Sequence, residues 1–313
     1  MRKLGSMLAL CAALAVVLIA FPGHRPVAQA ARTGIGAKLL EDAGLAVLWE
    51  GEKLGQGAAV SLFWGAPGLG GEAALPLEIA LADGDWVWAP GLLDTEEVGL
   101  RASSFARVAG NSVVVDGRLP KPEDLAEKPG QLIAFRAGRL GRVVRATCGE
   151  VYPNVLFDRT LLLMEDTVLD VFRAAGEEEY VFDYVLNIAG ELREASATLA
   201  WEDAPAEALA YLAPRGGRTR RAVCAQSFSL EFAAPDGKRL LGIRFLGAPE
   251  TEVFVAALGG REAARGSLLV VRRRGSGATF SAVLWPHGPQ DGAPMLELDD
   301  QGRLFFYPRE MKR

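Results

Sequence analysis

The sequence predicts an all-β protein, a large antiparallel β-sandwich preceded by a signal peptide. More than a dozen short apolar runs are each closed by turn residues, which is the pattern of buried strands. No long segment has the apolar spacing of an amphipathic helix, and the 36 glycines and 17 prolines supply turns. Residues 181–186 are apolar almost without a break, which indicates a central strand covered on both faces.

The first thirty residues have the pattern of a secretory signal peptide. Arg2 and Lys3 precede an apolar run over residues 7–21, and Ala28-Gln29-Ala30 supplies small residues for cleavage after Ala30. This pattern predicts a secreted or periplasmic protein. The alternative is an uncleaved N-terminal membrane anchor, since the apolar run is near the lower length limit for crossing a bilayer.

We divide the rest of the chain into a short segment over residues 31–42 and a sandwich domain over residues 43–313. Residues 33–42 are predicted as a short helix, and residues 120–129 as a polar loop. The central stretch 157–192 is predicted as three strands, at 159–164, 168–172 and 180–186, with an acidic turn at 176–179 before the third. Further strands are predicted at 45–49, 58–64, 75–81, 86–88, 112–115, 132–136, 143–147, 151–157, 195–201, 222–232, 239–246, 253–257, 268–272 and 279–284, with a closing hairpin at 296–298 and 304–307.

Charge and cysteine content exclude several classes of protein. Without residues 1–30 the chain carries 31 basic and 39 acidic residues, a net charge of −8, so a global basic field for nucleic acid is absent. No membrane contact beyond the signal peptide is predicted.

Cys148 and Cys224 could form a disulfide in an exported protein or be buried thiols, and the sequence leaves both open. No phosphate loop, Ser-His-Asp set, CxxC pair or nucleotide fingerprint is present, so no cofactor and no metal are predicted.

Several motifs resemble the C-terminal β-sheet domain of the heparinase II/III-like polysaccharide lyases. They are Gly70-Gly71, APG at 89–91, GNSVVVDG at 110–117, LDVF at 169–172, FDYVLN at 182–187, and the paired late segments LLVVRRR at 268–274 and TFSAVLWP at 279–286. The resemblance covers residues 43–286 and implies the sandwich fold of that domain. Asn187 stands where the family has His, and Glu72, Ala74 and Pro76 occupy the places of a His-x-His-x-Asp pattern.

These departures decide the expected function. Such lyases abstract a proton beside a uronic-acid carboxylate, which requires a base, an acid and a group that neutralises the carboxylate. In the family, part of this set lies in a helical toroid before the β domain, for which there is no room before residue 43. The mature chain holds one histidine, His287.

We therefore expect an exported, non-catalytic module that binds an acidic polysaccharide or a partner protein. Two alternatives remain: a polysaccharide lyase completed by a separate toroid chain, and a structural protein of the cell envelope.

Six residues are candidates for a site, each with a structural alternative. Tyr152 and His287 could transfer protons, or serve as a packing residue and a surface loop residue respectively. Asn111 and Arg159 could contact a sugar hydroxyl and a carboxylate, as the resemblance implies for their positions, or serve as a turn residue and a packing residue. Trp64 and Trp86 could stack on sugar rings or fill the core.

Overall fold

The computed structural model confirms the all-β fold and describes most of the chain after residue 35. The described residues are 36–52, 54, 57–65, 73–81, 84–87, 111–127, 129–138, 141–205, 208–209, 219–234, 239–258, 266–288, 293–298 and 304–307. The predicted signal peptide and Glu72 lie outside them. Within the described residues, no helix is long and apolar enough to cross a membrane.

The strands, in chain order, fall into an N-terminal, a central and a C-terminal group. The N-terminal group is β1 (Gly36–Leu40), β2 (Leu45–Trp49), β3 (Ala59–Phe63), β4 (Leu77–Leu81), β5 (Gly84–Val87) and β6 (Val113–Val115). The central group is β7 (Gln131–Gly138), β8 (Gly141–Tyr152), β9 (Val155–Met164), β10 (Thr167–Ile188), β11 (Glu191–Ala195) and β12 (Glu202–Ala204). The C-terminal group is β13 (Thr219–Cys224), β14 (Phe228–Ala233), β15 (Leu240–Phe245), β16 (Thr251–Leu258), β17 (Gly266–His287), β18 (Met295–Leu298) and β19 (Leu304–Tyr307).

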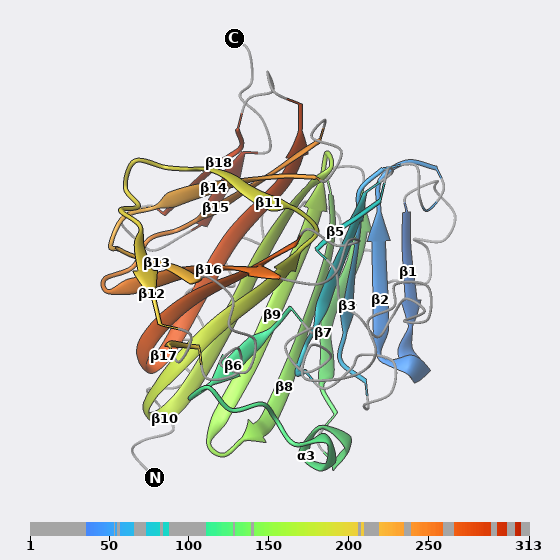
Figure 1. Cartoon of the computed structure of the whole chain (residues 1–313). Coiled ribbons are helices and arrows are strands. Elements are labelled where there is room, and N and C mark those ends of the chain that lie inside the picture. Colours follow the sequence, from blue (N-terminus) through green and yellow to red (C-terminus); the bar gives the residue numbers. More distant parts are fainter. Residues whose placement is uncertain are drawn as a thin grey trace.

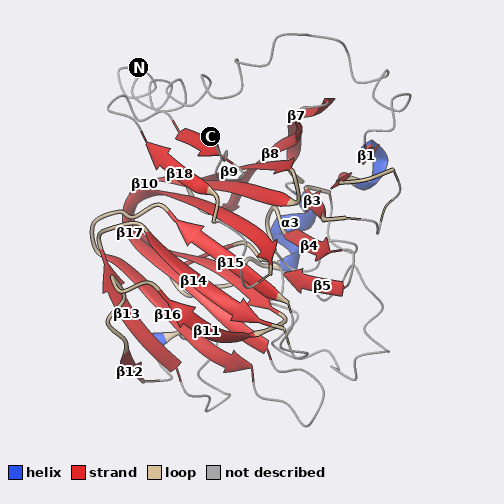
Figure 2. Ribbon diagram, turned by 90° about the horizontal axis from the view of Figure 1, so that it is seen from above, coloured by secondary structure: helices blue, strands red, loops and turns tan. Residues whose placement is uncertain are grey.

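Two strands of 22 residues, β10 and β17, run side by side through the whole molecule (Figures 1 and 2). The first half of β10 and the second half of β17 form the centre of one sheet, in the order β7-β8-β9-β10-β17-β15-β14-β11. Their other halves form the centre of a second sheet, in which β17 continues to β16, β13 and β12, while β10 pairs with β5 and β6. From β5 the second sheet continues through β4, β3 and β2 to β1. Each long strand therefore belongs to both sheets.

The change from one sheet to the other occurs at a register shift. It lies between Ala175 and Tyr180 on β10, opposite Gly275 and Gly277 on β17. Gly275 has φ of 139°, which is accessible almost only to glycine. The predicted acidic turn at 176–179 is therefore wrong: the chain bulges and bends there, but the strand continues.

The main core lies between the two sheets and explains the continuous apolar runs. Phe172 and Ile243 come from the first sheet, and Phe182, Val253 and Leu62 from the second. Alternate residues of the same strands pack on the outer faces, where two smaller apolar clusters form. One of them, with Val171, Val283 and Trp285, lies beneath the β18–β19 hairpin. That hairpin confirms the predicted closing pair.

Five further local predictions are corrected by the structure. The strands predicted at 151–157 and 222–232 each cross a break between two strands, β8 and β9 in the first case and β13 and β14 in the second. In place of the helix predicted over residues 33–42, Gly36–Leu40 is a strand paired with β2, and only Glu41–Ala43 is helical, as one 3₁₀ turn. The apolar side of the predicted helix is satisfied equally well by a strand whose alternate residues face the core. Within the loop predicted over residues 120–129, Pro122–Glu127 forms the helix α3, with Pro122 at its first position. Of the strand predicted at 195–201, only Ala195 lies in a strand, as the last residue of β11, and a turn follows it.

Candidate functional site

Two of the predicted site residues, Asn111 and Arg159, meet inside the sandwich. Arg159 lies on β9 and is fully buried. Its Nη1 donates to the carbonyl oxygens of Asn111 at 2.5 Å and Leu75 at 2.7 Å. Its Nε and Nη2 donate to the two carboxylate oxygens of Asp170 on β10, at 3.0 and 2.5 Å. All three guanidinium nitrogens are thus occupied by partners within the protein.

Asn111 is equally enclosed. Its Nδ2 donates to the carbonyl of Leu77 at 3.0 Å, and its Oδ1 accepts from the backbone N–H of Asn187 at 2.7 Å and from Asn187 Nδ2 at 3.1 Å. Asn111 is 0% and Asn187 2% exposed, so neither presents an amide to solvent. The predicted contact between Asn111 and a sugar would require these bonds to open.

We call Asn111, Arg159, Asp170, Tyr184 and Asn187 the buried polar cluster. Tyr184 completes it by donating from its hydroxyl to Asp170 Oδ2 at 2.6 Å. The guanidinium of Arg159 also lies over the Phe172 ring, 5.1 Å from its centroid. Sequence reasoning missed Asp170 and Tyr184 as partners. Their position as polar residues in the apolar run of β10 was the available signal, because buried polar groups must be paired.

The cluster holds two backbone positions in the left-handed region. Leu75 has φ of 51° and Asn111 has φ of 44°. Asparagine tolerates this conformation, but for a leucine it is a genuine outlier. Because Arg159 binds both carbonyls, it connects two segments that are 36 residues apart in the chain, and fixes both against β9.

Tyr152 is also engaged in the interior. Its hydroxyl donates to the carbonyl of Arg118 at 2.9 Å, and the residue is 7% exposed. Burial, with a smaller contribution from Asp183, raises the pKa of the Tyr152 phenol well above its ordinary value. The phenol therefore stays protonated at neutral pH and is unsuited to act as a base.

His287 lies apart from these residues, at the end of β17. It stacks on Trp285 with ring centroids 5.8 Å apart, its Nδ1 lies 2.9 Å from the carbonyl of Gly288, and its Nε2 lies 3.4 Å from Glu231 Oε2. None of the contacts that the structure describes for His287 joins it to the buried polar cluster or to Tyr152.

The tryptophan candidates have different outcomes. Trp64 is 7% exposed and lines a hollow of about 10 Å³, the space of a single water molecule, together with Leu75, Leu125 and Cys148. The backbone of Trp86 lies in β5, and its side chain is outside the described part of the structure.

The cysteines and metal ligands can also be placed. Cys148 and Cys224 are both buried thiols and do not form a disulfide, and burial raises the pKa of the Cys148 thiol to about 11. Among the described residues, no three His, Cys, Asp or Glu side chains are placed to hold a metal ion.

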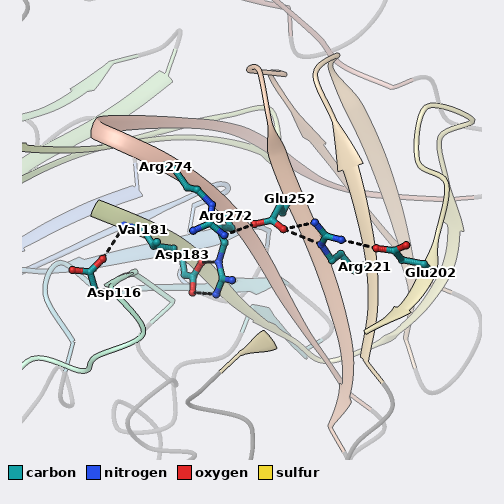
Figure 3. Close-up of polar contacts among 8 residues, drawn as sticks. All are labelled: Asp116, Val181, Asp183, Glu202, Arg221, Glu252, Arg272 and Arg274. Carbon is teal, nitrogen blue, oxygen red and sulfur yellow. Dashed lines mark hydrogen bonds and ion pairs between the residues drawn. The ribbon is translucent and has the colours of Figure 1, made fainter. Parts of the chain in front are cut away.

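A second group of polar residues crosses the outer face of the second sheet (Figure 3). It consists of Asp183 on β10, Arg272 and Arg274 on β17, Glu252 on β16, Arg221 on β13 and Glu202 on β12. We call these six side chains the charged row.

Pairs of opposite charge follow one another along the charged row. Asp183 accepts from Arg272 at 2.7 and 2.8 Å, and Glu252 accepts from Arg221 at 2.6 Å and from Arg274 at 3.0 Å. Arg221 also donates to Glu202 at 2.6 Å. Its hydrogen bonds to Glu252 and Glu202 raise the pKa of Arg221. The side chains of Asp183, Arg272 and Glu252 are mostly buried, at 0%, 13% and 13% exposed, whereas those of Arg274 and Glu202 are 55% and 62% exposed.

Comparison with known proteins identifies relatives of the fold. No family model and no curated protein matches the chain. Among solved structures, the heparan sulfate lyase HepC from Pedobacter heparinus matches 99% of this chain with a TM-score of 0.57 and 15% identity. A mutant of the same lyase matches 93% with a TM-score of 0.58 and 13% identity, and a heparinase III matches 91% with a TM-score of 0.54 and 10% identity.

The chain spans less than half of those proteins, 47%, 44% and 42% of their lengths respectively. At these identities the similarity shows the fold. The resemblance seen in the sequence motifs is thus confirmed as a heparinase-like β-sheet fold.

Proposed function

We propose that this chain is an exported, non-catalytic module that binds an acidic polysaccharide. The single observation that carries the non-catalytic part is the buried polar cluster. The family resemblance leads one to look for chemistry at Asn111, Arg159 and Asn187. These residues are enclosed and bonded to one another or to neighbouring segments.

Tyr152 and His287, the remaining candidates for proton transfer, do not supply the base that a lyase needs. Proton abstraction beside a carboxylate needs an acid, a base and a cation close together. Tyr152 is held protonated by burial, and His287 lies at the end of β17 with Glu231 as its charged neighbour. Glu231 is in turn paired with Arg193 at 3.2 Å, so its carboxylate is already neutralised within the protein.

The charged row supports the binding part of the proposal. The structural relatives include heparan sulfate lyases, which favours an acidic glycan as the ligand. Ion pairs at a protein surface contribute only about 0–1 kcal/mol each, so a carboxylate or sulfate group of a ligand can replace the exposed Glu202 as a partner of Arg221. Since the formal net charge of the chain is −5, this attraction is local to the row.

The test is a binding screen of residues 31–313 against heparin, alginate, pectin and a neutral glycan, with ultraviolet absorbance recorded in the same wells. We expect salt-dependent binding of an acidic glycan without new absorbance, because β-elimination creates an absorbing double bond and binding does not. New absorbance would refute the non-catalytic part and favour the lyase alternative.

The double variant Arg221→Gln/Arg274→Gln locates the binding surface. It should weaken glycan binding at least tenfold, while Arg136→Gln, at an exposed arginine of the edge strand β7, should leave it unchanged. Equal binding by both variants would exclude the charged row as the binding surface. Lack of binding to every glycan would refute the binding part.

A further inference from the structure

Three consecutive arginines on β17 have different electrostatic environments. Arg272 and Arg274 point to the outer face, where they pair with Asp183 and Glu252. Arg273 points to the opposite face, because side chains alternate along a strand. It lies against Phe280, with its guanidinium carbon 5.1 Å from the ring centroid.

Arg273 is bonded only to neutral oxygens. Its Nε donates to Thr251 Oγ1 at 3.2 Å, its Nη2 to the carbonyl of Leu246 at 2.6 Å, and its Nη1 to the carbonyl of Thr279. No carboxylate of the described residues forms an ion pair with it. Nevertheless the residue is only 9% exposed.

A buried cation without a counter-ion is energetically costly. Burial lowers the pKa of Arg273 to about 10, and no neighbouring charge opposes this effect. The guanidinium is still protonated at neutral pH. A full positive charge therefore resides in a mostly dry position, where an anion would be attracted far more strongly than at the surface.

Arg273 has hydrogen-bond donors that are not used in the bonds described above and could bind such an anion. A guanidinium carries five N–H groups, and three are used here, so one N–H on each Nη nitrogen remains. Two N–H groups on neighbouring nitrogens match the two oxygens of a carboxylate or a sulfate. The backbone beside the arginine is lightly covered, since Ser276 and Gly277 on β17 are small and exposed.

We infer that Arg273 is an anion-binding residue that takes one carboxylate or sulfate group of a sugar, at the corner where β17 passes from one sheet to the other. This site is on the opposite face of β17 from the charged row and does not depend on it. Two acids adjoin its partner Thr251 in the sequence: Glu250, which is exposed, and Glu252, which pairs with Arg221 and Arg274 on the outer face. Glu250 would limit the site to a single anionic group.

The test uses small probes, glucose 6-sulfate and glucuronate, with glucose as the neutral control. Binding is followed by calorimetry and by the Nε–H signals of arginine side chains in nuclear magnetic resonance spectra. We expect both acidic sugars to bind, glucose not to bind, and the Arg273 signal to move with the acidic sugars.

Arg273→Lys keeps the charge but loses the paired donors, and should weaken binding at least tenfold, while Arg136→Gln, at an exposed arginine of β7 outside both proposed sites, should leave it unchanged. An unmoved Arg273 signal in the wild-type protein would overturn the inference even if the variant failed to fold. So would equal affinity in Arg273→Lys. Because each probe carries one charge and the Arg273 signal reports on this site alone, this failure is distinct from a failure of the charged row to bind polysaccharide.

Discussion

The guanidinium of Arg159 binds both carboxylate oxygens of Asp170 on the neighbouring strand, and neither side chain is exposed to water. A pair of this kind adds little to stability in comparison with an apolar pair of the same shape, but each partner depends heavily on the other. It also positions the Leu75 and Asn111 carbonyls, so its loss would affect more than one strand.

Replacing Arg159 by Leu should therefore lower the free energy of unfolding by about 3–5 kcal/mol, because Asp170 is left charged and buried. Urea denaturation measures the loss. Arg145→Leu is the matched control, since Arg145 also pairs with a carboxylate, Asp158, but both side chains are partly exposed. It should cost about 1 kcal/mol or less. Equal losses in the two variants would contradict a special role for burial.

The buried tyrosines predict sensitivity to alkali. Burial raises the pKa of Tyr152 and Tyr184 in the folded protein, so the folded state retains protons that the unfolded state releases above a pH of about 10. Stability is thus unaffected below that pH and falls as the pH rises through and above it. Tyrosinate absorbance and circular dichroism should show ionisation of these two residues together with unfolding.

Tyr152→Phe provides the check on that interpretation. It should lose about 1 kcal/mol at neutral pH from the missing bond to Arg118, and its stability should decline less steeply between pH values of about 10 and 12. A slope identical to that of the wild type would show that Tyr152 is not one of the responsible groups.

Gly242 is predicted to be intolerant of a methyl group. A Cβ atom there would lie 2.2 Å from Cζ2 of Trp285, whose indole packs beneath the β18–β19 hairpin and has little room to move. Gly242→Ala should destabilise by about 1–3 kcal/mol. Gly149→Ala is the control, because a Cβ atom at Gly149 would have no neighbouring atom within 4 Å, and its thermal unfolding midpoint should not fall.

The turn between β9 and β10 contains strain that can be relieved. Glu165 and Asp166 have φ of 49° and 59°, as a two-residue hairpin requires, and glutamate is poorly suited to this conformation. Glu165→Asn should stabilise by about 0.5–1 kcal/mol in thermal unfolding. Asp166→Gly should stabilise the protein less, because it also removes the hydrogen bond that Asp166 Oδ1 accepts from the Ala58 N–H. A larger gain in Asp166→Gly than in Glu165→Asn would contradict this ranking.

The all-β fold class is predictable from the sequence, because strands are marked locally by short apolar runs and by the turn residues that close them. The same signals divide β10 into two strands, because Gly176 and three exposed glutamates look like a turn, whereas pairing with β17 on both sides of the bulge keeps the strand continuous. Register of this kind is set by a partner about a hundred residues away, which no local pattern contains.

The site is predictable only in part for the same reason. The resemblance selects Asn111 and Arg159, but the ion pair to Asp170 and the bond to Asn187 arise from tertiary packing. Arg272 and Arg274 pair with carboxylates and Arg273 does not, and this difference likewise cannot be predicted from three consecutive arginines. It depends on which face of β17 is closed and on where the carboxylates of β10 and β16 lie.

The sharing of β10 and β17 between the two sheets has a mechanical consequence. Neither sheet has a complete set of strands of its own, so no cut in the chain could release one of them intact. We expect unfolding to be a single all-or-none event for the whole sandwich. A force applied to one face would be carried by the same two backbones to the other.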